Sequence, residues 1–174
     1  PLNSLRKKAW RKEVTKFDLS VNSRKFDLSI EDIIAIAERE DVDARLIINA
    51  ADLSYGPFKE KSIRNELLTE KSILLVQGLE QYFKSVRMLV SSYFDFIPAW
   101  QLDDVMGSVN YNSASCGAHF DQYDVFLLQH TGEKRWLFDE IIHCDEDLDE
   151  ASELRLLKNF SPTSEVIAKA VSYT

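Results

Sequence analysis

The chain has 174 residues, 45% of them hydrophobic and 29% charged, which suits one soluble globular domain with a sizeable core. Its net charge of -8 argues against a nonspecific nucleic-acid-binding protein, which needs a basic surface. No apolar run approaches the roughly 20 residues that span a bilayer, and two cysteines give no disulfide framework. We therefore expect a cytoplasmic protein that binds neither membranes nor nucleic acid directly.

Residues 1–28 form an N-terminal segment whose structure the sequence does not define. The run KFDLS at 16–20 recurs at 25–29. Two copies are too few for a solenoid, which needs at least three repeats to bury a core. We therefore take residues 29–174 as the folded domain.

Helical and extended patterns alternate from residue 29 to residue 100. Ser29 and Asp32 have the spacing of a capping box, and hydrophobic residues follow at helical spacing. A sustained 3.6-residue period over residues 79–94 predicts one amphipathic helix that ends before Pro98. Three further short elements are expected: a strand at 43–49, a turn at 54–57, and a strand or helix entry at 72–77.

The second half of the chain is richer in strands. Residues 125–129 and 134–138 predict two strands joined by a turn at Thr131-Gly132, which is the signal of a β-hairpin. Because helices dominate the first half and strands the second, we predict an α+β fold. The remaining expectations are a strand at 105–111, a polar loop at 112–117, an exposed acidic loop at 145–153, a strand or short helix at 154–160, and no assignment for 161–174.

His119 and Asp121 are separated by one residue. In an extended strand, side chains two residues apart point to the same side, so an imidazole and a carboxylate can bind the same ion. The pair supplies two of the three ligands of the 2-His-1-carboxylate facial triad, which holds non-haem Fe(II). A single His-x-Asp motif is not specific, so the residues around it decide its meaning.

Those surrounding residues resemble a known family. The run HFDQYDVFLLQ at 119–129, followed by Gly132, Lys134 and Trp136, resembles the metal-binding segment of the JmjC/cupin 2-oxoglutarate oxygenases. The resemblance is greatest to the bacterial ribosomal oxygenases, which are protein hydroxylases. Four upstream segments share it: FIPAW at 96–100, DDVM at 103–106, GPF at 56–58 and SILLVQ at 72–77. The resemblance implies a helical N-terminal part packed on a partial double-stranded β-helix, the cupin jelly roll.

The resemblance also implies an activity. It implies an Fe(II)- and 2-oxoglutarate-dependent hydroxylase that acts on an arginine or histidine side chain of a ribosomal protein. By this resemblance His119 and Asp121 bind Fe(II). Lys134 would pair with the C5 carboxylate of 2-oxoglutarate, since an anion buried without a partner is costly, and Asn110 would also contact the co-substrate. An acidic protein suits a basic ribosomal protein as its partner.

A site of this kind requires the chain to bend after Asp121. If Thr131-Gly132 is the centre of a hairpin turn, a straight strand puts Lys134 roughly 26 Å along from Asp121, at about 3.3 Å per residue. A lysine and a bound 2-oxoglutarate cannot bridge that distance. We therefore expect a bend at residues 122–124, as at a corner of a jelly roll.

The facial triad also requires a second histidine. Two others remain, His130 at the predicted turn and His143 beside Cys144. His130 faces away from the expected site, and a lone histidine such as His143 is more often structural than a ligand. In the family this ligand follows some tens of residues after the His-x-Asp pair, so we expect a C-terminally truncated oxygenase. An unclosed jelly roll exposes strand edges, which favour homo-oligomers.

Two other interpretations stay open. A non-catalytic cupin-fold module, or pseudo-enzyme, would keep the fold and a protein-binding surface without turnover. A small-molecule-binding cupin would hold Mn or Zn and would not depend on 2-oxoglutarate. Succinate formation that requires His119 would distinguish the oxygenase from both.

Overall fold

The computed structural model describes residues 14–16 and 27–170, which fall into two compact units. The first unit consists of Lys25–Gly117 and Glu150–Leu154. The second consists of Pro1–Arg24, Ala118–Asp149 and Arg155–Thr174. The predicted N-terminal segment, including its KFDLS repeat, lies outside the described residues except at 14–16 and 27–29.

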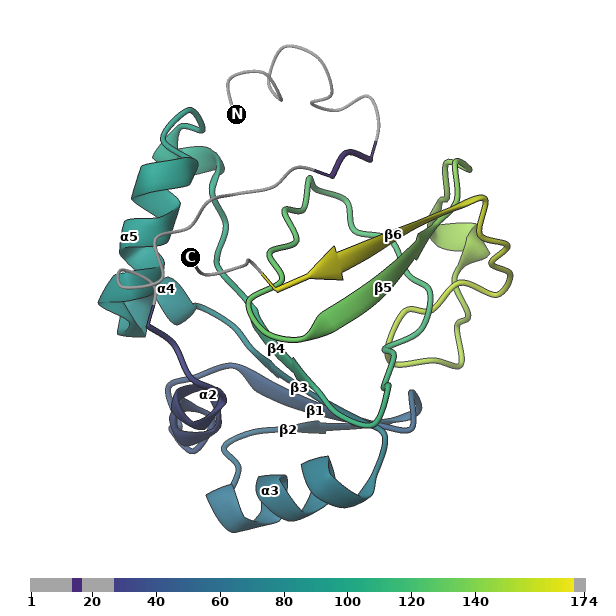
Figure 1. Ribbon diagram of the computed structural model, residues 1–174. Coiled ribbons are helices and arrows are strands. Elements are labelled where there is room, and N and C mark those ends of the chain that lie inside the picture. The colour runs from purple at the N-terminus through teal and green to yellow at the C-terminus, as the bar shows by residue number, and fades with distance from the viewer. Residues whose placement is uncertain (1–13, 17–26, 171–174) are drawn as a thin grey trace. The chain divides into compact units, whose positions relative to one another are not determined.

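The first unit is built on a four-stranded antiparallel sheet in the order β2-β1-β3-β4 (Figure 1). The central strand β3 pairs with β1 on one side and with β4 on the other. Leu74 of β3 is fully buried opposite Leu46 and Val109, so the core lies at the middle of the sheet. The strands are β1 (Ala44–Ile48), β2 (Asp52–Tyr55), β3 (Ser72–Val76) and β4 (Gly107–Asn110). The strands predicted at 43–49 and 105–111 are confirmed, and residues 72–77, predicted as a strand or helix entry, form a strand.

The turn predicted at 54–57 is wrong at Ser54 and Tyr55, which belong to a strand, although the backbone does bend at Gly56. Residues 52–55 form β2, an edge strand that pairs with β1 from Ile48↔Asp52 to Arg45↔Tyr55. The turn lies at 49–51 instead, where Asn49 and Ala50 have φ of 53° and 57°. The edge strand escapes prediction because its sequence, DLSY, is mostly exposed and so lacks an apolar pattern.

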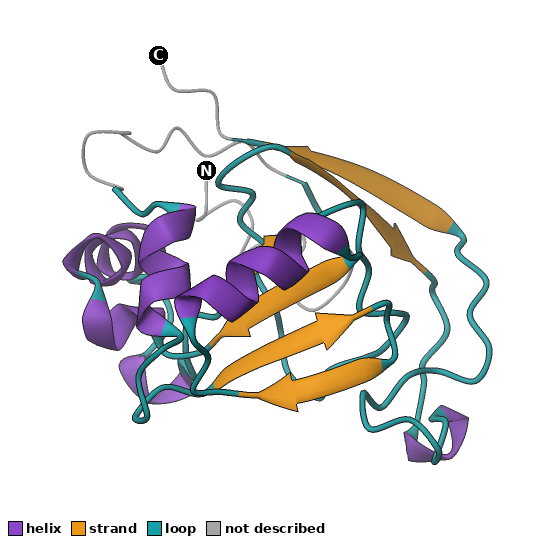
Figure 2. Cartoon of the chain, turned by 90° about the horizontal axis from the view of Figure 1, so that it is seen from below, coloured by secondary structure: helices purple, strands orange, loops and turns teal. Residues whose placement is uncertain are grey.

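Helices α2 (Ile30–Ile36) and α3 (Glu60–Thr69) belong to the same unit. The predicted capping box is confirmed at α2: the Ser29 hydroxyl accepts the Asp32 N–H at 3.1 Å, and the Asp32 carboxylate accepts the Ser29 N–H at 2.9 Å. The hydrophobic pattern of residues 60–69 does not predict α3, because only two residues of this helix, Ile63 and Leu67, are buried. This helix lies across one face of the sheet (Figure 2). No helix among the described residues is long and apolar enough to cross a membrane.

The single helix predicted at 79–94 is two helices, α4 (Leu79–Tyr82) and α5 (Lys84–Tyr93). Phe83 separates them with an extended backbone, φ −109° and ψ 118°. The hydrophobic period continues through this break, since Leu79 and Val86 are both buried. Periodicity therefore does not reveal the break. A short 3-10 helix, η2 (Ala99–Gln101), follows Pro98.

The second unit contains a two-stranded antiparallel sheet of β5 (Glu133–Phe138) and β6 (Ser164–Lys169). The strand predicted at 134–138 is confirmed, but the predicted hairpin with residues 125–129 is wrong. Residues 125–129 pair with no strand among the described residues. The partner of β5 comes from residues 161–174, where the sequence shows no clear period.

The segment between these strands is mostly irregular. Residues 154–160 do not form the predicted strand or helix, because only Leu157 makes an isolated bridge, to Leu148. The acidic stretch 145–153 is largely exposed, as predicted, and holds a short 3-10 helix, η3 (Asp145–Asp147). Helices with antiparallel sheets confirm the α+β class.

Candidate metal and co-substrate site

His119 and Asp121 lie in a loop of the second unit, and both side chains are exposed. The loop forms no strand ladder, so the pleat that was expected to align the two side chains is absent here. The backbone bends at Gln122 and Tyr123, within the stretch where the sequence requires a bend. The assignment of the pair as metal ligands therefore stays a prediction.

Asp121 lines an open groove of about 640 Å³ in the second unit. The groove is strongly anionic, since Asp124, Asp145 and Glu146 line it as well. His119 is not among its lining residues, so this groove contains only one of the two predicted ligands. The lining residues are 120–124 and 143–146.

Lys134 lies on β5, where Lys134, Trp136 and Phe138 are half-buried on one face of the strand. The Lys134 Nζ atom lies over the Trp136 ring, 4.3 Å from its centroid, in a cation–π contact. The lysine stem thus covers apolar surface rather than extending into bulk solvent. The Trp136 Nε1 atom is buried and has no hydrogen-bond partner within the described part of the chain, so an N–H donor remains for a ligand.

Asn110 lies on β4 of the first unit. Its Oδ1 atom accepts a hydrogen bond from Ser108 Oγ at 2.8 Å. Its Nδ2 atom is buried and unpaired with respect to residues 14–16 and 27–170. A buried amide without a partner is unusual, and it is consistent with the predicted contact to a ligand.

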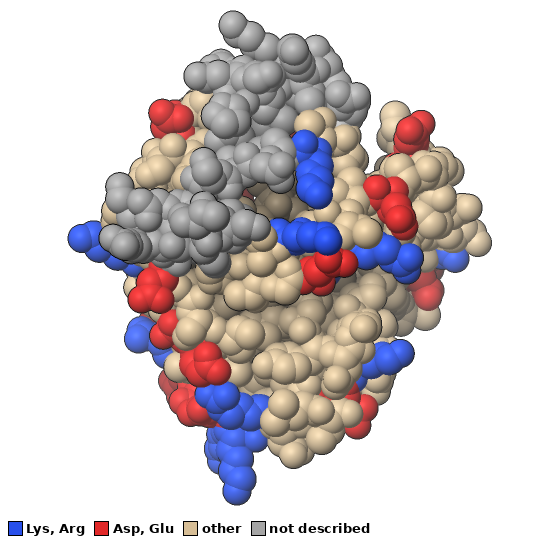
Figure 3. All heavy atoms as spheres, viewed as in Figure 1, with Lys and Arg blue, Asp and Glu red and all other residues tan. Residues whose placement is uncertain are grey.

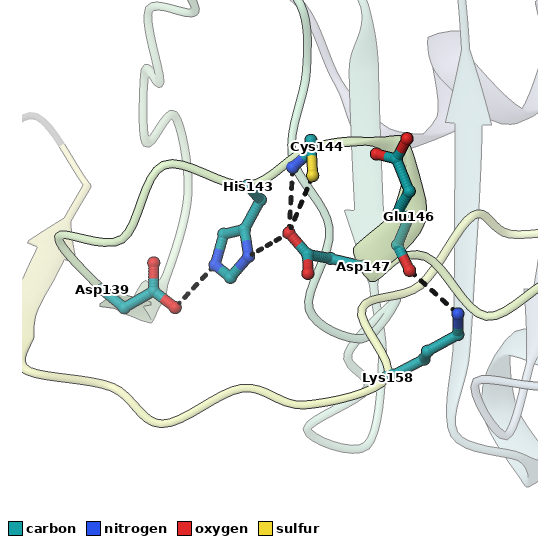
Figure 4. A network of polar contacts seen from close by, with 6 residues as sticks. All are labelled: Asp139, His143, Cys144, Glu146, Asp147 and Lys158. Carbon is teal, nitrogen blue, oxygen red and sulfur yellow. Dashed lines mark hydrogen bonds and ion pairs between the residues drawn. The ribbon is translucent and has the colours of Figure 1, made fainter.

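His143 is held between two carboxylates (Figure 4). Its Nε2 atom is 2.9 Å from Asp139 Oδ2, and its Nδ1 atom is 3.5 Å from Asp147 Oδ2. Its side chain is only 11% exposed. This environment favours a structural role for His143 over a role as the missing metal ligand. This network was not predicted from the sequence, although the spacing of Asp139, His143 and Asp147 could have indicated it.

The two carboxylates raise the pKa of His143 above its ordinary value, and the hydrogen bond to Asp139 is the largest cause. The pKa is raised in the folded state, so the charged imidazole stabilises the fold fully below the ordinary histidine pKa, about 6.5. That contribution is lost as pH rises through the folded-state pKa. We expect Asp139→Asn to lower the His143 pKa more than Asp147→Asn, as measured by NMR titration of the imidazole. Equal changes, or none, would contradict the assigned cause.

The donors assigned from the sequence match part of an iron site. One imidazole and one carboxylate occupy two of the three protein positions of a facial triad. In the part of the chain that the structure describes, no three His, Cys, Asp or Glu side chains gather as a metal site. The fit to iron therefore rests on His119 and Asp121, and within the second unit the fit to 2-oxoglutarate rests on Lys134 and the unpaired Trp136 N–H.

The sequence of this region matches a known family. Residues 89–170, which include the His-x-Asp pair and Lys134, match the family model for the JmjC domain. The predicted resemblance to the JmjC family is thus confirmed for these residues.

Two curated relatives of this chain carry related names. The "Probable ribosomal oxygenase" of Haemophilus influenzae is 43% identical over 110 residues, which are 61% of this chain and 26% of that protein. The "Ribosomal protein uL16 3-hydroxylase" of Escherichia coli is 30% identical over 142 residues, which are 78% of this chain and 37% of that protein. The chain therefore spans less than half the length of either relative.

Solved structures share the fold. The E. coli YcfD structure has a TM-score of 0.79 at 24% identity and covers 98% of this chain and 45% of the YcfD chain. A structure of YcfD, a ribosomal oxygenase, in complex with cobalt and 2-oxoglutarate has a TM-score of 0.69 at 24% identity, covering 90% of this chain and 45% of that chain. The predicted JmjC/cupin fold is therefore confirmed.

Proposed function

We propose that this chain is part of an Fe(II)- and 2-oxoglutarate-dependent hydroxylase of the ribosomal oxygenase type, which modifies a side chain of a ribosomal protein. The observation that carries the proposal is the JmjC match over residues 89–170, which contains His119, Asp121 and Lys134. The names of the two curated relatives support it, as does the structural neighbour that binds cobalt and 2-oxoglutarate.

Each predicted residue has a role in this proposal. His119 and Asp121 would hold the iron, which when bound supplies the activation of O₂ as 2-oxoglutarate is decarboxylated to succinate. Lys134 pairs with the C5 carboxylate, and the Trp136 ring beneath its ammonium restricts the directions in which that ammonium can point. The unpaired N–H group of Trp136 is a further donor for a bound anion. The contact of Asn110 with the co-substrate is proposed from the family resemblance alone.

A basic ribosomal protein is the partner that this proposal requires. On the face shown in Figure 3, acidic and basic side chains are interspersed rather than gathered by sign. The acidic groove beside Asp121 is therefore a better argument for a basic substrate than the net charge of the chain. Several carboxylates line this groove, and they attract cationic side chains that enter it. A substrate of this kind is made in the cytoplasm, so we place the protein there and propose no direct contact with nucleic acid.

The test is succinate production. The purified chain is incubated with Fe(II), ascorbate and 2-oxoglutarate, and succinate is measured with and without a uL16 peptide. Succinate that the unmodified chain forms and that His119→Ala does not form would support the proposal. His130→Ala removes an imidazole outside the pair and serves as the matched control that keeps activity.

Two outcomes would overturn the proposal. If no variant forms succinate, the chain is a non-catalytic cupin-fold module. If Mn or Zn co-purifies with the chain and no 2-oxoglutarate dependence is seen, the chain is a small-molecule-binding cupin. Under either result, the similarity to the ribosomal oxygenases would reflect common descent and not a shared activity.

A further inference from the structure

Phe120 is the residue between the two predicted metal ligands, and it lines the acidic groove together with Asp121. Its side chain is half-buried, whereas His119 and Asp121 on either side are exposed. Phe120 is thus the least exposed of the three residues, and its side chain can anchor the loop. Because the backbone joins Phe120 to both neighbours, contacts that restrain Phe120 also restrain the backbone that carries His119 and Asp121.

The Phe120 ring packs on His143. The two rings are stacked with centroids 6.2 Å apart and an interplanar angle of 21°. His143 in turn is held from both ends of its ring by Asp139 and Asp147, at 2.9 Å and 3.5 Å. A ring held at both nitrogens cannot rotate without breaking a charge-assisted hydrogen bond or ion pair. His143 thus gives Phe120 a surface of fixed orientation.

The carboxylate on one side of His143 is itself fixed. Asp147 Oδ2 accepts the Cys144 N–H at 2.9 Å and lies 3.5 Å from Cys144 Sγ (Figure 4). Lys158 Nζ donates to the Glu146 carbonyl at 2.9 Å, and the Lys158 N–H donates to the Asp147 carbonyl at the same distance. These contacts hold the short helix η3 against Lys158. The His143 imidazole is therefore held by a carboxylate, that of Asp147, which is itself fixed by further hydrogen bonds.

A second contact fixes the other side of His119. The Ala118 carbonyl accepts the Leu157 N–H at 2.8 Å, and Leu157 forms the isolated bridge with Leu148. Leu157 and His143 therefore hold both neighbours of His119, Ala118 by its backbone and Phe120 by its ring. In a loop without strand pairing, these contacts take the place of a ladder.

We propose that His143 is a positioning residue, which orients the His119–Asp121 pair through Phe120. This inference rests on the proposed function, because it assigns the orientation of a metal-binding pair. Partners outside the ligand set that orient ligands typically change metal affinity by about 10- to 100-fold when they are removed. Since His143 acts through one intervening ring, we expect about a 10-fold effect.

The test compares His143→Ala with Phe120→Ala, and uses His130→Ala as the control. Hydrogen exchange of the peptide that covers residues 118–124 is measured first, in the metal-free chain. We expect faster exchange in both test variants, with the exchange of β1 and β3 unchanged, which would show that the first unit is intact. Co(II) binding, followed by visible absorption, is expected to weaken about 10-fold, with a changed band pattern that a distant packing defect would not produce.

The outcomes separate the two proposals. Unchanged exchange across residues 118–124 in His143→Ala would overturn the positioning role, whatever the metal does. Equal Co(II) affinity and equal spectra in the variants and the unmodified chain would overturn it too, and would leave the proposed function standing. If the unmodified chain binds no Co(II), the proposed function fails, and the exchange data still decide whether His143 orders the loop.

Discussion

The Lys134→Met variant is expected to bind 2-oxoglutarate about 10- to 150-fold more weakly than the unmodified chain. A hydrogen bond to a charged group contributes about 1.5–3 kcal/mol, and each 1.4 kcal/mol is a factor of ten in affinity. Methionine keeps an unbranched side chain over the Trp136 ring, so the contact seen at 4.3 Å loses its charge rather than its packing. Calorimetric titration of the Co(II)-loaded chain with 2-oxoglutarate measures the effect.

A matched lysine is available on the other face of the same sheet. Lys169 pairs across the strands with Glu133, at 3.3 Å, and its side chain is 72% exposed. Lys169→Met makes the same change in charge, and we expect it to leave the affinity for 2-oxoglutarate unchanged. Lys134→Arg keeps the cation and should retain most of the binding. If Lys134→Met binds as tightly as the unmodified chain, the lysine serves only to cover Trp136.

The sequence predicts best those elements whose contacts are local. The capping box at Ser29 forms because its two hydrogen bonds join residues three apart, so spacing alone defines it. Strand β3 is predicted because nearly all its residues are buried, which requires a continuous apolar run. A bend was expected at residues 122–124 and lies at Gln122 and Tyr123, although the hairpin assumed in that argument does not form.

The sequence predicts poorly what depends on distant partners. Strand β5 is visible as a pattern, but nothing in its residues shows that it pairs with β6, some thirty residues later, rather than with the apolar run at 125–129. Pairing is decided by the whole fold, and alternating apolar runs are interchangeable before that fold is known. The same reason hides the contact of Leu157 with Ala118 and the stacking of His143 on Phe120. The predicted ligands were thus found by motif, whereas the contacts that hold them became visible only in three dimensions.

The largest effect on the free energy of unfolding is expected from a substitution in helix α3. Leu67 is 1% exposed and belongs to the hydrophobic core, whereas its neighbour Leu68 is 69% exposed. Removing a buried leucine side chain costs about 2–5 kcal/mol, which combines the lost transfer free energy with the cost of the cavity. The same change at an exposed position usually alters stability by less than about 0.5 kcal/mol. We therefore expect Leu67→Ala to destabilise the first unit strongly and Leu68→Ala to leave it nearly unchanged.

The comparison isolates burial because everything else is matched. Both substitutions exchange leucine for alanine in the same helix turn, so any gain from the higher helix propensity of alanine is nearly equal in the two variants. Urea unfolding followed by far-ultraviolet circular dichroism should give a much lower midpoint for Leu67→Ala, since small domains are stable by only about 5–15 kcal/mol. Similar midpoints for the two variants would mean that α3 does not pack on the sheet in solution. The core would then lack one of the layers that hold β3, the strand on which Leu74 is fully buried.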